Sequence, residues 1–198
     1  MMTSSSLFLM KHLCCVCINE RGKEEKQLRY AELWQQSVLV ANMLSDKTKL
    51  NNQEQPLPHI ILCYPFGLDF IVSYVGCLLA NTIAVPVYPP NPGSIKQSLL
   101  KLNKVVDNCK PILALTNSTF NRYRRFNSII QKWPKNLQWL CTDTYIEQNT
   151  KHINELFLNK LPGLSNDKSQ IAFIQYTSGS TGDPKGVCIS YTNFQLNR

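Results

Sequence analysis

The sequence predicts an α/β fold, a mostly parallel sheet with flanking helices. Short apolar runs alternate along the chain with longer segments of helical periodicity, which is the order of parallel β-α-β units. The run from His59 to Tyr64 is almost continuously apolar, as expected of a strand covered on both faces. With 198 residues and 43% hydrophobic content the chain can bury a core, so we expect one domain over residues 14–198 after an extension of residues 1–13.

The first elements expected are a hairpin and a helix. Cys14–Asn19 and Glu24–Leu28 read as paired strands joined by a polar turn. A helix is predicted over Tyr30–Ser45, and Arg29 before it offers no capping hydroxyl, so we expect its first turn to fray. The residues expected on its buried face are Leu33, Ser37, Val40, Ala41 and Leu44.

The longest apolar stretch covers residues 70–88 and could suggest a membrane span. Pro86 argues against a single span, and Asn81 tolerates the left-handed conformation that ends a helix. We therefore favour a buried helix capped by Asp69, followed by a strand over Ala84–Val87, and keep the membrane span as the alternative.

Further strands and helices are expected to alternate up to the end of the chain. The segment Asp143–Lys168 shows no clear periodicity and is left unassigned. The expected helices are Ser94–Asp107, with Ile95, Leu99, Leu102 and Val106 inward, Ser118–Lys132, and one starting at Tyr191; the expected strands are Pro111–Leu115, Leu137–Thr142, Ile171–Gln175 and Val187–Ser190.

The net charge of +8 is concentrated between Asp107 and Asp143, where no acidic residue occurs. Tyr123, Phe126 and Trp133 interleave with the basic residues there, a combination that single-stranded nucleic acid binding also uses. We favour a solvated helix face whose aromatic side chains point into the core, and consider nucleic acid unlikely. The basic residues are Lys110, Arg122, Arg124, Arg125, Lys132 and Lys135.

The eight cysteines lie mostly in apolar runs and lack the paired spacing of a zinc site. We interpret them as reduced, buried residues of a cytoplasmic protein. The cluster of Cys14, Cys15 and Cys17 leaves a soft-metal site as the alternative, although no metal site is expected.

The stretch Tyr176–Val187, YTSGSTGDPKGV, predicts a phosphate-binding loop after a buried strand. Backbone N–H groups of a glycine-rich loop can bind an anion, hydroxyls add donors, and Lys185 adds a positive charge. Its spacing fits neither the P-loop nor the dinucleotide pattern, and a flexible surface turn is the alternative. The predicted phosphate ligands are Thr177, Ser178, Gly179, Ser180, Thr181, Gly182, Lys185 and Gly186.

This stretch resembles the phosphate-loop signature of the adenylate-forming (AMP-dependent synthetase/ligase) superfamily. The run Cys63–Ser94, CYPFGLDFIVSYVGCLLANTIAVPVYPPNPGS, is similar to the fatty acyl-AMP ligase branch. Arg29–Leu33, RYAEL, resembles the family's Thr-Tyr-x-Glu-Leu at the first helix, with Arg29 in place of the threonine.

The resemblance implies the first part of the large N-terminal domain of such an enzyme. It implies ATP with Mg²⁺, a fatty acid activated as acyl-adenylate with release of pyrophosphate, and an acyl carrier protein or CoA as acceptor. In the family, the adenine, ribose, magnesium and catalytic-lysine elements follow this loop. We therefore expect a fragment that is inactive alone; the alternatives are a fragment of an acyl-CoA synthetase and a non-catalytic binding module.

Overall fold

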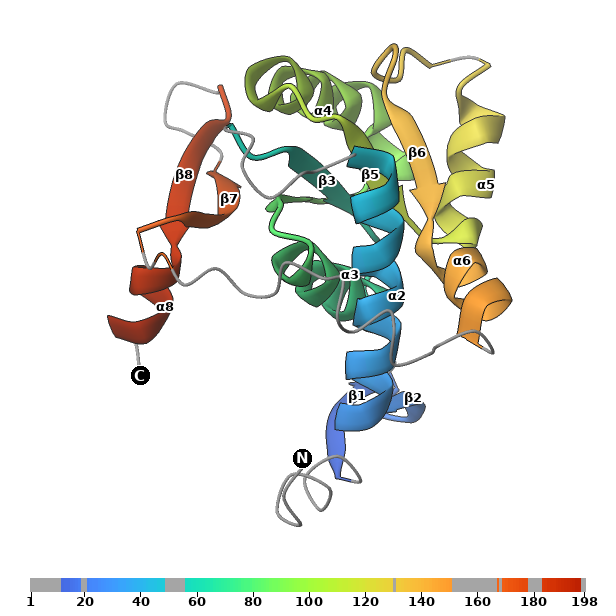
Figure 1. The fold of residues 1–198 in the computed structure, drawn as a ribbon. Helices are drawn as coiled ribbons and strands as arrows, with labels where there is room; N and C mark the ends of the chain where they lie inside the picture. Colours follow the sequence, from blue (N-terminus) through green and yellow to red (C-terminus); the bar gives the residue numbers. More distant parts are fainter. Residues whose placement is uncertain are drawn as a thin grey trace.

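The computed structural model describes residues 12–18, 21–48, 56–129, 131–150, 167, 169–177 and 183–196. A six-stranded sheet with the order β6-β5-β3-β4-β7-β8 forms its centre (Figure 1). All neighbouring strands are parallel except β7 and β8, which confirms the mostly parallel sheet. The strands are β3 (His59–Cys63), β4 (Ile83–Val87), β5 (Leu113–Thr116), β6 (Gln138–Cys141), β7 (Ile171–Thr177) and β8 (Lys185–Ser190).

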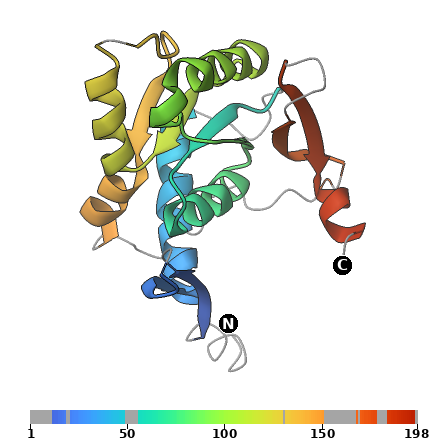
Figure 2. The ribbon, with the colours of Figure 1, turned by 180° about the vertical axis from the view of Figure 1, so that it is seen from behind.

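Helices cover both faces of the sheet, as the view from behind shows (Figure 2). On one face lie α2, α3 and α6, and on the other lie α4 and α5. The helices are α2 (Tyr30–Thr48), α3 (Leu68–Leu79), α4 (Ile95–Cys109) with the short 3₁₀ turn η1 (Pro92–Ser94) before it, α5 (Ser118–Asn127), α6 (Thr142–Asn149) and α8 (Tyr191–Leu196).

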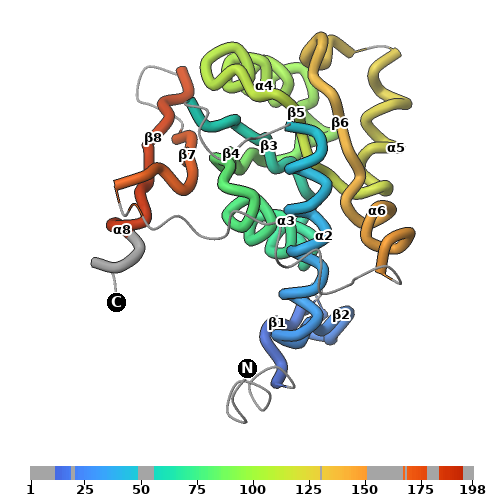
Figure 3. The backbone as a smooth tube through the Cα atoms, viewed as in Figure 1, coloured from blue at the N-terminus to red at the C-terminus, as the bar shows by residue number. Residues whose placement is uncertain are grey.

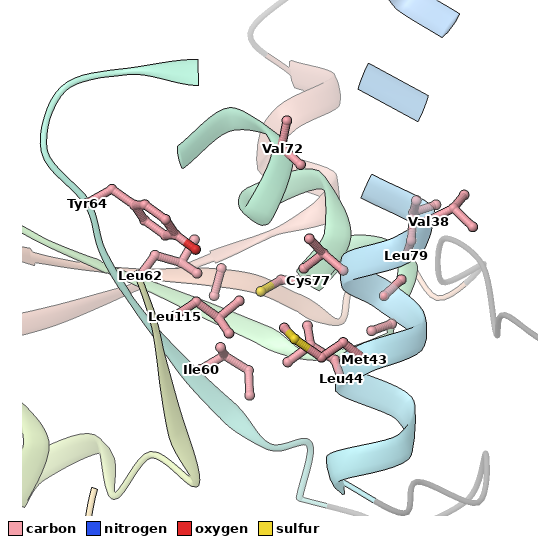
Figure 4. Packing of buried hydrophobic residues seen from close by; sticks show 14 of the residues in the cluster. Val38, Met43, Leu44, Ile60, Leu62, Tyr64, Val72, Cys77, Leu79 and Leu115 are labelled. Atoms are coloured by element: carbon pink, nitrogen blue, oxygen red, sulfur yellow. The ribbon is translucent and has the colours of Figure 1, made fainter. Parts of the chain in front are cut away.

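Strand β3 is covered on both faces, which explains why its sequence is continuously apolar. Side chains alternate between the two faces of a strand. Ile60 and Leu62 therefore pack with α2 and α3, whereas Ile61 and Cys63 pack with α4 and α5. Figure 4 shows the first of these two clusters, in which Cys77 from α3 lies among side chains of the sheet and of α2.

Helices α2 and α3 approach each other closely at Gly76. A Cβ atom at this position would lie 2.7 Å from both Cβ and Cγ1 of Val40. The Ser37 hydroxyl also donates a hydrogen bond to the Val72 carbonyl, 3.1 Å away. The α2 face predicted from the sequence is confirmed, with Leu33 only partly buried.

A separate two-stranded sheet, β1 (Leu13–Ile18) and β2 (Glu24–Arg29), lies at the start of α2 (Figure 3). The expected hairpin is thus confirmed, and β2 leads directly into α2. The Arg29 backbone N–H donates to Glu32 Oε2 at 2.7 Å, which is one half of a capping box. Glu32 therefore holds the first turn of α2, although no capping hydroxyl precedes it.

The predicted cap of α3 is wrong. Gly67 occupies the N-cap position of α3, and because it has no side chain it makes no side-chain cap hydrogen bond. Asp69 instead accepts a hydrogen bond from the Asn117 side chain at 3.0 Å, so it supports the start of α5. Asn81, with φ of 54°, does take the predicted left-handed conformation after α3.

Tertiary contacts decide the structure where the sequence shows no clear periodicity and where a predicted helix ends early. Helix α6 forms in a segment without clear periodicity, because Tyr145 and Ile146 pack against the core cluster under α2. Helix α5 ends at Asn127, five residues before the predicted end. Phe126 is 74% exposed on it rather than directed into the core.

The basic segment is otherwise built around a buried aromatic group. The Arg124 guanidinium lies 4.8 Å from the centre of the Trp139 ring and 6.0 Å from that of Trp133. Such cation–π contacts stabilise the packing of a charged side chain on aromatic rings. Among the aromatic residues of this segment, Trp133 is buried as predicted and Tyr123 is partly buried.

The cysteines are free thiols, but they are not all buried. Cys17, Cys63, Cys77 and Cys109 lie in the core, whereas Cys188 on β8 is exposed. The prediction of burial is therefore wrong for Cys188, because β8 is an edge strand. Cys14, Cys15 and Cys141 are half-buried. Within the described part of the chain, no helix is long and apolar enough to cross a membrane.

Candidate functional site

Strands β7 and β8, which precede and follow the predicted phosphate loop in the sequence, pair antiparallel at one side of the molecule (Figure 1). Thr177 at the end of β7 pairs with Lys185 at the start of β8, and both side chains are exposed. The Thr177 hydroxyl donates to the Lys185 carbonyl at 3.5 Å. The five predicted ligands Ser178, Gly179, Ser180, Thr181 and Gly182 lie outside the described residues.

Gly186 belongs to β8 and not to the loop in which the sequence placed it. The strand begins two residues earlier than predicted, because Lys185 and Gly186 pair with Thr177 and Tyr176. A Cβ atom on Gly186 would lie 3.1 Å from Cζ and 3.3 Å from the hydroxyl of Tyr176. The missing side chain therefore leaves room for the Tyr176 ring on the neighbouring strand.

Helix α4 contacts the chain on both sides of the loop. The Tyr176 hydroxyl donates a hydrogen bond to Asn108 Oδ1, and Lys104 forms an ion pair with Asp183. The hydrogen bond and charge of Lys104 hold the pKa of the Asp183 carboxyl below its usual value. Sequence reasoning found neither Lys104 nor Asn108, because their partners lie 79 and 68 residues away.

An apolar cavity of about 910 Å³ opens at the carboxyl ends of β3 and β4, beside β7. Ligands of open α/β sheets bind at such ends of the strands. Phe66 and Tyr88 at the cavity are each 93% exposed, and Gln175 of β7 contributes a polar group. Other residues lining the cavity include Tyr64, Pro65, Phe70, Ile71, Pro86 and Pro90. Several belong to the run Cys63–Ser94 that the sequence singled out, but periodicity alone gave no sign of a cavity.

A buried group of hydroxyls fixes one wall of this cavity. The Tyr64 hydroxyl lies 2.7 Å from Ser73 Oγ and 2.9 Å from Thr142 Oγ1, and so joins the residue that follows β3 to α3 and α6. Burial raises the pKa of Tyr64 well above its usual value, so the phenol stays protonated. Its position makes it a structural group of the wall.

The family model that matches this chain is that of the AMP-binding enzymes, over residues 10–197. The chain belongs to this family. The match covers both the run Cys63–Ser94 and the hairpin that carries the phosphate loop. The resemblance on which the sequence prediction relied is therefore confirmed at the level of the family.

Two relatives of this AMP-binding chain are fatty-acid ligases by name. It is 30% identical over 175 residues to the medium-chain-fatty-acid–[acyl-carrier-protein] ligase JamA of Moorena producens, covering 86% of this chain and 27% of JamA. It is 30% identical over 181 residues to the long-chain-fatty-acid–AMP ligase FadD32 of Mycolicibacterium smegmatis, covering 90% of this chain and 26% of FadD32.

A solved structure shares the fold of this AMP-binding chain. The crystal structure of the fatty acid AMP ligase from Legionella pneumophila matches with a TM-score of 0.70 at 29% identity, covering 93% of this chain and 28% of that one. The chain thus spans about a quarter of the length of the relatives it matches.

Proposed function

We propose that this chain is part of an ATP-dependent fatty acyl-AMP ligase and provides the phosphate-binding part of its active site. The observation that carries the proposal is the paired arrangement of Thr177 and Lys185 at the two ends of the glycine-rich loop. The names of JamA and FadD32 support a fatty acid as the carboxylate substrate. JamA supports an acyl carrier protein as acceptor, with CoA as the alternative.

The donors at the loop fit a polyphosphate. ATP would supply the α-phosphorus that the carboxylate attacks, with pyrophosphate as the leaving group. The exposed Lys185 ammonium group would bind the β- and γ-phosphates and offset the charge that builds up on the pyrophosphate. The Thr177 hydroxyl would donate to a phosphate oxygen.

None of the described residues is assigned as a magnesium ligand. Among the described residues there is no group of three or more His, Cys, Asp or Glu side chains that could hold a metal ion. Asp183, the nearest carboxylate to the loop along the chain, forms an ion pair with Lys104.

The apolar cavity supports a fatty acid over a small polar acid. Its volume of about 910 Å³ and its aromatic and proline lining are of the kind that bind an alkyl chain. An acyl-CoA synthetase would present similar features, so this branch remains the second candidate. A non-catalytic module that binds nucleotide through the same loop is the third.

Titration with Mg·ATP and with pyrophosphate tests the proposal. Lys185→Met should weaken binding of both by roughly tenfold to 150-fold, since a charge-assisted hydrogen bond contributes about 1.5–3 kcal/mol. Lys135→Met, which removes an exposed lysine next to β6 at the opposite edge of the sheet, is the matched control and should bind as the unchanged chain does. Equal affinities for Lys185→Met and the unchanged chain would contradict the proposed role.

A further inference from the structure

We propose that Lys104 and Asn108 of helix α4 are positioning residues that hold the two strand ends on either side of the phosphate loop. Asn108 holds the end of β7 through Tyr176, and Lys104 holds the approach to β8 through Asp183. The inference rests on the proposed function only in taking this hairpin as the nucleotide site.

The two α4 residues are suited to act together. They lie four residues apart in a helix, which brings their side chains to one face about one turn apart. Tyr176 and Asp183 are the described residues on the two sides of the loop that this face contacts. One helix face therefore contacts both sides of the loop and fixes this end of the β7–β8 ladder, where Thr177 pairs with Lys185, relative to α4.

Helix α4 is itself fixed on the sheet. Leu99, Leu102, Val105 and Cys109 are buried against the strands on its opposite face. The carbonyl of Cys109 also lies 2.5 Å from Nδ1 of His59, at the start of β3. The helix is thus a firm support, whereas among the described strands β8 pairs only with β7.

Gly186 allows the contact between Tyr176 and Asn108. A methyl group at position 186 would come within 3.0 Å of Ile174 Cγ2 and within 3.1–3.3 Å of the tip of the Tyr176 ring, the part that reaches Asn108. Gly186→Ala should therefore loosen the same contact as Tyr176→Phe. A glycine next to the loop lysine then has a steric role that does not require an unusual backbone conformation.

Lys104 also has an electrostatic role. An unpaired Asp183 carboxylate would repel a polyphosphate bound at the neighbouring loop. Pairing with Lys104 offsets this charge, and both side chains are largely exposed, so the ion pair can be replaced without disturbing the core. Removal of Lys104 should therefore weaken phosphate binding more than removal of Asn108 does.

Hydrogen exchange of the β7 and β8 amides tests the positioning role directly, without nucleotide. Lys104→Met and Asn108→Ala should each raise exchange at Tyr176–Thr177 and Lys185–Gly186 about twofold to fivefold, as expected for exposed contacts. The reversed pair Lys104→Asp with Asp183→Lys should restore exchange to within about twofold of the unchanged chain. Lys101→Met, an exposed lysine on the same helix, is the matched control.

The exchange rates of the β7 and β8 amides decide whether the inference holds. Unchanged exchange in both single variants, or no restoration by the reversed pair, would overturn it. Circular dichroism melting of each variant checks that it is folded. If a single variant is not folded, the comparison of the reversed pair with the unchanged chain still decides the test.

Titration with Mg·ATP separates this inference from the proposed function. The electrostatic role is supported if Lys104→Met binds Mg·ATP more weakly than Asn108→Ala does. Adding Asp183→Asn to Lys104→Met should then recover part of the lost affinity. Equal affinities in all variants would overturn that role. If exchange responds as expected but even the unchanged chain fails to bind Mg·ATP, the positioning role stands and the nucleotide function fails.

Discussion

At the scale of single residues, Tyr64 lies in the run Cys63–Ser94 that resembles the family, and its role is to stabilise the wall of the apolar cavity. Its hydroxyl contacts Ser73 and Thr142, whose own separation is 3.4 Å. Tyr64→Phe leaves these two hydroxyls with only long hydrogen bonds, the 3.4 Å contact between them and a 3.4 Å one from Thr142 Oγ1 to the Thr116 carbonyl. We therefore expect a loss of about 1–2 kcal/mol in the free energy of unfolding, measured with urea. The matched control is Tyr88→Phe at an exposed position, which should change stability by less than about 0.5 kcal/mol. Equal effects of the two substitutions would contradict this view of Tyr64.

The thiols should differ strongly in reactivity. Burial raises the pKa of Cys77 to about 12 and that of Cys109 to about 11. Because the thiolate is the reactive form, both should remain unlabelled by iodoacetamide in the folded protein at neutral pH, and their labelling should rise only as the pH approaches these values. Cys188 on the exposed edge should be labelled first.

Mass spectrometry of labelled peptides checks this order, with the urea-unfolded chain as reference. A Cys188→Ser variant should lose the fastest phase of labelling and keep the slow ones. Labelling of Cys77 as fast as that of Cys188 in the folded chain would show that the core around α3 opens readily.

At the scale of elements, the contact of α2 with α3 depends on Gly76. Gly76→Ala would force Val40 to move, because the new Cβ would lie 2.7 Å from two of its atoms. Overpacking of this kind costs about 1–3 kcal/mol, which should lower the urea midpoint. In the control Gly93→Ala, the new Cβ would meet only Asn91 Oδ1 at 3.4 Å, so a smaller change is expected. A Gly76→Ala variant as stable as the control would mean that the helices shift apart without cost.

The elements also show what the sequence can predict. Apolar runs and helical periodicity were sufficient for β3, α3 and β4, because burial on both faces of a sheet leaves a continuous pattern. They failed for α6, which is short and held by packing against α2.

The candidate site shows the same limit more sharply. The residues of the loop were recognisable because they are contiguous and have distinctive chemistry. Asp69 was misassigned because its partner, Asn117, is 48 residues away, and Lys104 has a partner 79 residues away. Contacts of exposed polar side chains over such separations leave no periodic pattern in a sequence.

At the scale of the whole molecule, β8 is the last strand at one side of the sheet that the described residues form. Val187 on this strand is 46% exposed, and exposed apolar edges promote pairing between molecules. Val187→Lys should therefore reduce self-association of the 198-residue chain, measured by light scattering over a range of concentrations. Leu100→Lys, which makes the same kind of change on a helix, should have a smaller effect. A larger effect of Leu100→Lys would show that the molecules associate through α4 instead.

The pairing of β4 with β7 has a consequence for how the protein is made. Ala84 of β4 pairs with Phe173 of β7, so 89 residues (173 minus 84) must be added to the growing chain before the partner strand exists. At about 5–20 residues per second on the ribosome, this delay is roughly 4–18 s. The edge of β4 that β7 covers is without its native neighbour during that time, so a chaperone that binds exposed strand edges would act on it at this stage of synthesis.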